Sequence, residues 1–320
     1  MPNLKLIAPT AVLALTLAAC AGEPAAPPEP SPEPIAQEEL DAQQEAANLA
    51  LVDEWWRSVI QARHVEMAEQ FMAPDYLQHN PNIDTGRDAF VAIFGAREPV
   101  EIPATLTPAP VLQFAKGDYV VFVWEREGTN PNDDTQTYAF NFFDIVRVEN
   151  GLVAEHWDSV YKNSTELVNP GIGPRPVDPP NTPEEAANEA LADRLFKDIL
   201  QYGNLDLADG VMAEGYIQHN PNVPTGRAGF VEFFSQFAQP EPVMDAWRDE
   251  PELTLTSDNI TLYMFKRYSE DPADASRAYK WNWFDMVRVD DGLVQEHWDM
   301  ATMTQPPASV PVPAGFVEYR

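Results

Sequence analysis

Apolar residues recur along this chain with two periods, first helical and then strand-like. In residues 36–61 they return every three or four positions, which predicts an amphipathic helix. A shorter helix is expected at residues 65–72. Phe90 and Phe94 fit one face of a further helix, for which Thr85 is the expected N-cap.

Stretches in which aromatic and β-branched residues alternate with polar ones follow these helices and predict antiparallel strands. The predicted strands cover residues 111–115, 119–126, 138–148 and 152–161, and then 253–255, 260–268, 279–289 and 293–300. Helices come first and a sheet second, and this order occurs twice. The pattern therefore predicts two α+β units in tandem.

An internal duplication accounts for the repeated order. Residues 138–158 match residues 279–299 at fourteen of twenty-one positions, and residues 76–94 match residues 216–234 at twelve of nineteen. Similarity at a fixed offset near 140 residues indicates a repeated structural unit. We refer to the two copies as the first and second repeat.

Composition shifts mark the boundaries between the predicted parts of the chain. Thr182 opens a capping box with Pro183 at the first helical position, so a new helix is expected to begin there. The predicted order is a signal peptide 1–19, a Pro- and Glu-rich tether 20–36, a first domain 37–168, a Pro-rich linker 169–182, a second domain 183–306 and a tail 307–320.

The N-terminus has the features of an export signal. Lys5 precedes an apolar run that is too short to span a membrane, and small residues precede Cys20, the single cysteine. The segment Leu17-Ala18-Ala19-Cys20 resembles the lipobox of bacterial lipoproteins, which implies a lipid anchor on Cys20. Ala21 follows where retention in the inner membrane would have Asp, so the resemblance implies the outer membrane, facing the periplasm. An ordinary secretory signal with a stray cysteine is the alternative.

Charge narrows the set of partners. The formal net charge is −31, and such a chain would be repelled by the phosphates of nucleic acids and by anionic lipid surfaces. We therefore expect no nucleic-acid partner, and contact with a membrane only through the N-terminal lipid.

The repeated stretch reads as a β-hairpin with Asn150-Gly151 at its turn, and its register decides which side chains meet. A two-residue loop would place Asp144 opposite Trp157. A three-residue loop with a bulge would place Asp144 opposite His156.

We favour the three-residue loop because it gathers Asp144, His156 and Asp158 on one face of the hairpin, together with Ala154. The same register leaves Arg147 beside Glu155 on the opposite face, where the two can form a salt bridge. A shift of one residue would separate the acidic and basic groups.

The residues shared by both repeats resemble the SnoaL-like polyketide cyclase family, in particular its predicted aldol-condensation group, within the nuclear transport factor 2-like superfamily. The resemblance covers about 250 residues and rests on Tyr76, Gln78-His79-Asn80-Pro81, Gly86-Arg87, Phe90, Asp144, Arg147, Gly151 and Glu155-His156-Trp157-Asp158, with their counterparts in the second repeat.

The resemblance implies a fold, a chemistry and a set of site residues. Each domain would be a cone of helices packed on a curved antiparallel sheet with a pocket, and the two domains would form an intramolecular pseudo-dimer. The reaction would need no cofactor and would use an acid/base aspartate on a small hydrophobic carbonyl compound. The residues that match are Asp158 and Asp299 as acid/base groups, with Asp144 and Asp285 as the second polar group.

Further residues are candidates by their chemistry. His156 and His297 can orient the second aspartate or shuttle a proton. The candidates for binding the carbonyl group of a substrate are Tyr76, Gln78, His79 and Asn80, and in the second repeat Tyr216, Gln218, His219 and Asn220.

Packing roles compete with these functional ones. The pair of Asp144 and His156 can be a buried hydrogen bond only, and His79 can simply fasten its loop to the sheet. Trp157 and Trp298 are expected to be core or interface aromatics. A zinc or iron site made of histidines and carboxylates is a further alternative, although no short metal-binding spacing supports it. At the level of the whole protein, the alternative to an enzyme is a non-catalytic binding or assembly module.

Overall fold

The computed structural model describes residues 37–303 and 310–311 of the 320-residue chain, which belong to one compact unit. The predicted signal peptide, the tether with Cys20 and nearly all of the tail lie outside the described residues. Within the described ranges, no helix is both long enough and apolar enough to cross a bilayer.

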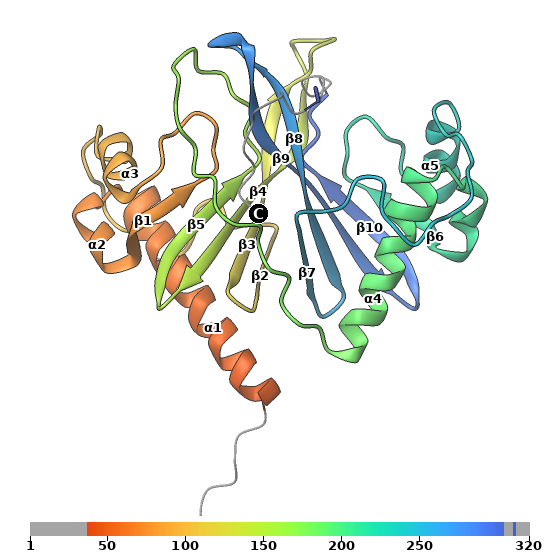
Figure 1. Ribbon diagram of the computed structural model, residues 1–320, viewed down its shortest axis with the longest axis horizontal. Helices are drawn as coiled ribbons and strands as arrows, with labels where there is room; N and C mark the ends of the chain where they lie inside the picture. The colour runs from red at the N-terminus through yellow and green to blue at the C-terminus, as the bar shows by residue number, and fades with distance from the viewer. Residues whose placement is uncertain (1–36, 304–309, 312–320) are drawn as a thin grey trace, which may run out of the picture. The chain divides into compact units, whose positions relative to one another are not determined.

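The two repeats contain the same elements in the same order (Figure 1). The first consists of α1 (Gln37–Trp55), η1 (Trp56–Gln61), η2 (Val65–Met67), α2 (Ala68–Phe71), β1 (Met72–Gln78), α3 (Arg87–Phe94), β2 (Leu112–Lys116), β3 (Tyr119–Thr129), β4 (Thr137–Glu149) and β5 (Leu152–Asp158). The second consists of α4 (Pro183–Asp193), η3 (Arg194–Gln201), η4 (Leu205–Gly210), β6 (Met212–Gln218), α5 (Arg227–Phe234), β7 (Leu253–Ser257), β8 (Ile260–Asp271), β9 (Asp274–Asp290) and β10 (Leu293–Asp299).

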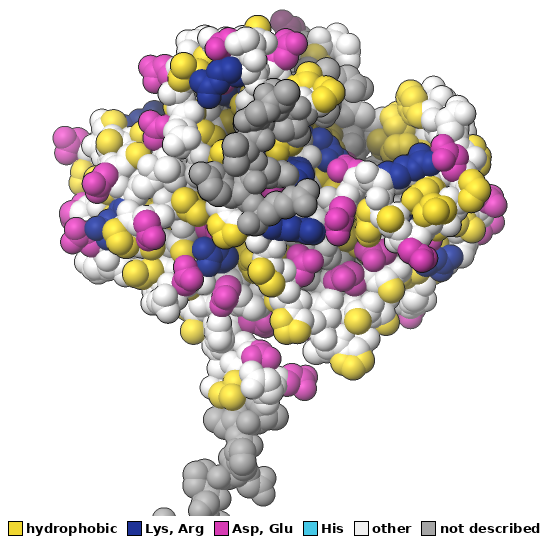
Figure 2. All heavy atoms as spheres, in the orientation of Figure 1, with side chains coloured by type: hydrophobic (Ala, Val, Ile, Leu, Met, Phe, Trp, Pro, Cys, Tyr) yellow, Lys and Arg dark blue, Asp and Glu magenta, His cyan; other side chains and the backbone are white. Residues whose placement is uncertain are grey.

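Each repeat has its own five-stranded sheet, with the strand orders β1-β5-β4-β3-β2 and β6-β10-β9-β8-β7. The predicted α+β class with two tandem domains is confirmed. Helix α4 begins at the predicted capping box, in which Thr182 accepts a hydrogen bond from the backbone N–H of Glu185. On the face drawn in Figure 2, acidic side chains are scattered widely and Lys and Arg are few, as the composition requires.

The strands β1 and β6 were not predicted. The segment 65–72 was expected to be helical throughout, but the helix ends at Phe71 and β1 begins at Met72. This strand lies at the edge of the sheet, where Pro74 is tolerated because one side of the strand needs no partner. It runs parallel to β5 and pairs Gln78 with His156.

The segment between β1 and α3 also differs in its capping. The N-cap of α3 is Gly86, with φ 101°, and Thr85 is not the cap. The Thr85 hydroxyl instead accepts from the Gln78 backbone N–H at 3.2 Å and donates to the Tyr76 carbonyl at 3.1 Å. Arg87 donates to the Met72 carbonyl, so this loop is tied to the start of β1.

The hairpin of β4 and β5 has a register that differs from both expected ones. Asn150 and Gly151 form a two-residue turn with φ values of 52° and 73°, so Glu149 pairs with Leu152. One residue is then added in β5 at Ala154, and from there on Arg147 pairs with Glu155.

The bulge restores the predicted faces although the predicted turn was wrong. Asp144 lies opposite Asp158, and Asp144, His156 and Asp158 share one face, because the extra residue reverses the alternation. Val153, and not Ala154, contributes to the core on that face. The second repeat has the same arrangement, with the extra residue at Gln295.

Buried apolar residues form three clusters. The first lies between the helices and sheet of the first repeat and includes Trp55, Phe90 and Val146. Its counterpart in the second repeat includes Phe196 and Phe230. A third cluster combines residues of both sheets, including the two predicted core aromatics Trp157 and Trp298.

The two repeats contact each other through an aromatic pair at equivalent positions and through a buried ion pair. Phe143 stacks on Phe284, its own counterpart, with ring centroids 5.6 Å apart and planes 11° apart. Lys162 of the first repeat forms a buried ion pair with Asp271 of the second at 2.7 Å. A residue that contacts its own counterpart indicates local two-fold symmetry.

We predict that Gly151→Ala destabilises the hairpin. An added Cβ would meet no atom within 4 Å, so the cost comes from the left-handed backbone and should be about 1–2 kcal/mol. Urea unfolding should show a lower midpoint with an unchanged slope. Gly210→Ala is the matched control, because that glycine also has open space but no left-handed φ. Equal effects of the two substitutions would contradict the turn described here.

Candidate functional site

The candidate site of the first repeat is built on three neighbouring strands. Asp144 lies on β4, His156 and Asp158 lie on β5, and Gln78 ends β1. His156 Nε2 lies 2.9 Å from Asp144 Oδ1, and His156 Nδ1 lies 3.1 Å from Gln78 Oε1. Asn80 Nδ2 donates to Asp158 Oδ2 at 2.7 Å.

Hydrogen bonds from the backbone determine the protonation state of His156. The backbone N–H of Asn80 donates to Gln78 Oε1, so this atom is an acceptor and His156 Nδ1 must carry a proton. Nε2 faces a carboxylate oxygen of Asp144. Burial lowers the pKa of His156, but the hydrogen bond and charge of Asp144 outweigh burial and raise it. His156 therefore donates from Nδ1, and its Nε2 shares a proton with the Asp144 carboxylate.

Asp158 combines a raised pKa with a carboxyl oxygen that has no partner among the described residues. Burial is the main cause that raises its pKa, from 3.8 to about 6; the Asp144 carboxylate raises it further, while His156 and the Asn80 hydrogen bond lower it. Among the described residues, its buried Oδ1 has no hydrogen-bond partner. A carboxyl with a pKa near neutrality and a free oxygen can act as a general base or acid.

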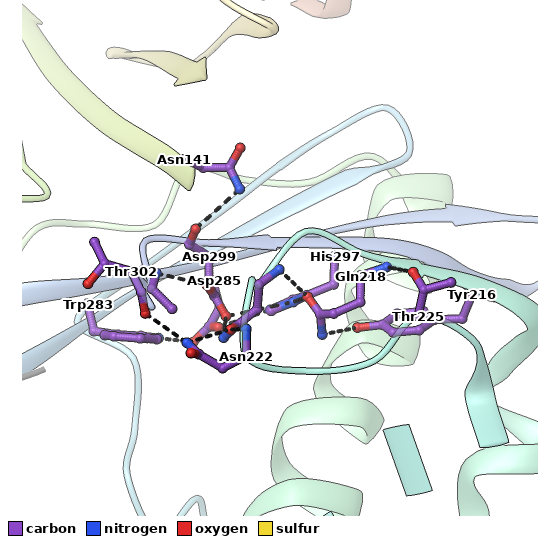
Figure 3. A network of polar contacts seen from close by, with 12 residues as sticks. Asn141, Tyr216, Gln218, Asn222, Thr225, Trp283, Asp285, His297, Asp299 and Thr302 are labelled. Carbon is purple, nitrogen blue, oxygen red and sulfur yellow. Dashed lines mark hydrogen bonds and ion pairs between the residues drawn. The ribbon is translucent and has the colours of Figure 1, made fainter. Parts of the chain in front are cut away.

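The second repeat reproduces this geometry (Figure 3). His297 lies 3.0 Å from Asp285 Oδ1 and 2.8 Å from Gln218 Oε1, and Asn220 donates to Asp299 at 2.7 Å. The pKa of Asp299 is also raised to about 6, chiefly by burial. Its Oδ1 differs from that of Asp158 because it accepts from the backbone N–H of Ala301.

A cavity of about 300 Å³ reaches the site of the second repeat. One part of its wall is polar and holds the carboxyl, imidazole and amide groups just described, with the Tyr216 hydroxyl. The rest of the wall is apolar and mostly aromatic. Its aromatic side chains are Phe196, Phe230, Phe233, Phe234 and Trp283.

The first repeat covers the same groups with larger side chains. Trp56 stands where the second repeat has Phe196, and it stacks on Trp124 at 5.5 Å and 28°. Its ring lies 6.2 Å from that of His156. The side chain of Asp144 is 4% exposed, against 14% for Asp285. The aspartate bonded to the histidine is thus more exposed in the second repeat, whereas Asp158 and Asp299 are both buried.

His79 and His219, expected to bind substrate, are not part of these sites. His79 lies on the opposite face of the sheet, where it stacks on Trp157 with centroids 4.7 Å apart and bonds to Glu155 at 2.7 Å. His219 stacks on Trp298 in the same way and does not line the cavity. The two histidines lie apart from the acid/base groups because β1 ends at Gln78, and alternation sends the next side chain to the other face.

On that opposite face, Glu155 connects two basic side chains. Arg147 Nε donates to Glu155 Oε2 at 2.8 Å, as the sequence predicted, and His79 binds the other oxygen. Burial alone would raise the pKa of Glu155, but the His79 hydrogen bond and then the Arg147 hydrogen bond and charge lower it overall. These residues anchor the loop after β1 to the sheet.

The remaining predicted binding residues orient the site. Gln78 is held between His156 and the Tyr76 hydroxyl, to which its Nε2 donates at 3.0 Å. Tyr216, Gln218 and Asn220 line the cavity of the second repeat. Burial raises the pKa of the Tyr76 and Tyr216 phenols well above the ordinary value, so both keep their protons.

Sequence reasoning missed the indole donors. Trp124 Nε1 donates to Asp144 Oδ2 at 2.8 Å, and Trp283 Nε1 donates to Asp285 Oδ2 at 2.7 Å. In an apolar strand a tryptophan signals packing, and no local pattern distinguishes one that also donates to a carboxylate. The π-helical turns that carry Trp56 and Phe196 were equally invisible in the apolar spacing.

A metal ion is chemically compatible with the site. Asp144, His156 and Asp158 offer one ligand atom each within 4.8 Å of one another, and so do their counterparts. In this structure, however, the imidazole and Asp144 face each other at hydrogen-bond distance. No step of the chemistry below is assigned to a metal.

The family can now be stated. The family model described as SnoaL-like domain matches residues 52–156. This part of the chain is a SnoaL-like domain. The match covers the first repeat from α1 to His156, and the second repeat has the same topology. No curated protein matches the chain.

Several solved structures are similar to a SnoaL-like domain of this chain. TsrD from Streptomyces laurentii is 21% identical, with 36% of this chain and 87% of TsrD covered and a TM-score of 0.26. A candidate polyketide cyclase from Bacillus cereus is 16% identical, with 40% and 84% covered and a TM-score of 0.28. A nuclear transport factor 2-like protein of unknown function from Mesorhizobium loti is 20% identical, with 39% and 98% covered and a TM-score of 0.28.

We predict that Asp158→Asn changes how stability depends on pH. The folded state holds the Asp158 proton more tightly than the unfolded chain, so this stabilisation is complete below pH 4 and is lost as pH rises through about 6. The shift corresponds to about 3 kcal/mol, and Asn has no such proton to lose. The melting temperature of the variant relative to wild type should therefore rise between pH 4 and 7.

Asp133→Asn is the control of opposite sign. Hydrogen bonds from the side chain and backbone of Thr135 lower the pKa of Asp133, so its contribution is present at neutral pH and lost on acidification. Parallel pH profiles for Asp158→Asn and wild type would contradict the raised pKa of Asp158.

Proposed function

We propose that the protein binds a small, neutral, hydrophobic carbonyl compound and catalyses proton transfer at the carbon next to its carbonyl, as in an aldol-type condensation, cyclisation or isomerisation. The observation that carries this proposal is the cavity of the second repeat, where an aromatic wall meets a buried carboxyl with a pKa of about 6. The SnoaL-like domain match supports a small-molecule role.

Asp299 is the proposed base. Its carboxylate takes the proton from the α-carbon, the electrons of that C–H bond form the C=C bond of an enolate, and the carbonyl oxygen gains the negative charge. In an isomerisation, Asp299 returns this proton to another carbon of the conjugated enolate. In an aldol-type step, the enolate carbon attacks a second carbonyl, the π electrons of that C=O bond move to its oxygen, and Asp299 gives its proton to the resulting alkoxide. No cofactor enters this scheme.

Tyr216 is the proposed donor to the developing oxyanion, and His297 stabilises its negative charge without donating to it. The Tyr216 hydroxyl accepts from Gln218 at 3.1 Å, and among the described residues its own proton has no acceptor. His297 adds a fixed positive charge beside the two aspartates. Donors held in place before the reaction stabilise the enolate more than mobile water does.

The lining sets the class of ligand. Among the described residues that line the cavity, the charged groups are two carboxylates and one imidazolium, and there is no Lys or Arg. Substrates that carry phosphate or carboxylate groups would be repelled. The flat aromatic side chains favour a planar ring system, and about 300 Å³ limits it to roughly the size of a fused pair of rings.

The wider context of this activity remains a prediction from the sequence. We propose a lipid anchor on Cys20 in the bacterial cell envelope, on the outer membrane facing the periplasm. The intramolecular pseudo-dimer is supported by the stacking of Phe143 on Phe284. A non-catalytic binding module is the second candidate function, favoured by the aromatic lining of the cavity, which can hold a ligand without proton transfer.

We predict that the protein accelerates α-proton exchange of bicyclic aromatic ketones. 1-Tetralone and 2-tetralone in D2O report this step by NMR without requiring the natural reaction. The rate should increase with pH through about 6, because Asp299 can accept a proton only in its ionised form. Asp299→Asn should lower the rate roughly 100-fold or more.

Two controls accompany this experiment. Asp133→Asn removes a carboxylate that lies outside both sites and should retain the rate. Dialysis against EDTA should have no effect, whereas its abolition of exchange would favour the metal alternative. Binding of the ketones without exchange would support the binding-module function, and neither binding nor exchange would refute the proposal.

A further inference from the structure

The indole that contacts the site stands on a different strand in each repeat. In the first repeat Trp124 of β3 pairs directly with Phe142 of β4. At the equivalent positions the second repeat has Phe265 on β8 and Trp283 on β9, which also pair directly. Tryptophan and phenylalanine have thus exchanged places across one strand pair.

The exchange preserves one hydrogen bond. Trp124 donates to Asp144 Oδ2 and Trp283 donates to Asp285 Oδ2, although the two indoles approach from neighbouring strands. We call this oxygen, which does not face the histidine, the outer oxygen. Both routes are available because a residue two positions along the same strand and its cross-strand partner flank the aspartate on one face. Figure 3 shows the second arrangement, with Trp283 pointing at Asp285.

Packing alone does not explain this result. Exchanging the two side chains conserves the volume of the pair, so the core is filled equally well either way. Filling space does not require that an N–H group meet the same carboxylate oxygen in both arrangements. The retained feature is the donor to that oxygen.

We propose that the indole is a positioning residue of the histidine–aspartate pair, Trp124 for Asp144 and His156, and Trp283 for Asp285 and His297. Its N–H satisfies the outer carboxylate oxygen, so the aspartate remains an anion and the shared proton stays on Nε2 of the histidine. Without the donor, a buried carboxylate oxygen is unpaired and the neutral carboxyl is favoured. The importance of this charge for catalysis rests on the function proposed above.

The other groups that face the pair do not replace the indole. Gln218 Oε1 accepts from the far nitrogen of His297, and Asp299 adds negative charge 4.0 Å from that same nitrogen. Tyr263, opposite Asp285 on β8, uses its hydroxyl to donate to Asp193. Among the described residues, Trp283 is thus the donor to the outer oxygen of Asp285.

The test is the position of the proton, read by 15N NMR of His297 in the full chain at pH 7. In wild type the Nε2 resonance should lie in the protonated range and show one-bond coupling to hydrogen. In Trp283→Phe it should move toward the unprotonated range and lose that coupling. Trp281→Phe is the matched control, because that indole donates to Ser269 and should leave His297 unchanged.

Transplanting the indole separates positioning from packing. The double variant Phe265→Trp with Trp283→Phe recreates the arrangement of the first repeat and should restore the protonated Nε2 signal. Trp124→Phe, read at His156, is the equivalent test in the other repeat, should Trp283→Phe fail to fold.

A protonated Nε2 in folded Trp283→Phe would overturn the proposal, and so would a folded double variant that does not recover the signal. Neither readout depends on turnover. An inactive protein with the expected NMR shifts would therefore refute the proposed reaction and leave the positioning role intact.

Discussion

A single added residue in β5, and its counterpart in β10, determines which groups meet in this protein. Side chains of a strand alternate between faces, so the two-residue turn alone would have sent His156 and Asp158 away from Asp144. The bulge at Ala154 reverses the alternation and returns them to the face of the first repeat's own core. The hydrogen bond between His156 and Asp144, the raised pKa of Asp158 and the hydrogen bond from Asn80 all follow from that reversal.

The sequence allowed us to predict which side chains share a face of the hairpin, but not the combination of turn and bulge that places them there. The repeated motif showed that Asp144, His156 and Asp158 belong together, and chemical sense favoured a register that unites them. Several combinations of turn length and bulge place the same side chains on the same face of the hairpin. The residues of the turn do not show which combination occurs. Strand β1 escaped prediction because its edge position tolerates a proline that usually argues against a strand.

The positions of loop residues were predicted less well, because they depend on where the neighbouring strand ends. His79 follows directly after β1, so its face depends on where that strand ends, and a structured loop can turn it either way. The indole donors required knowledge of cross-strand pairs, which alternation within one strand does not supply. The helix-forming segments and the capping box at Thr182, by contrast, are local features and were predicted closely.

The two repeats surround the same polar groups with different aromatic side chains. The acidic, imidazole and amide groups keep their geometry, while the surrounding aromatic residues change size and strand. Trp56 and Trp124 cover the first site, and Phe196 leaves space beside the second. The aromatic surroundings diverged, whereas the hydrogen bonds among the aspartates, histidine, glutamine and asparagine are the same in both repeats.

The stacking of Phe143 on Phe284 has a consequence for a fused chain. In a homodimer this self-contact would be lost on dilution, and every substitution would occur on both sides of the axis. Covalent linkage makes the contact independent of protein concentration and lets the two sides differ. Lys162 forms a buried ion pair with Asp271, whereas the residues at the corresponding positions of the other repeat are Met303 and Asn130, which carry no charge. Such asymmetry is open only to a protein that carries both halves in one polypeptide.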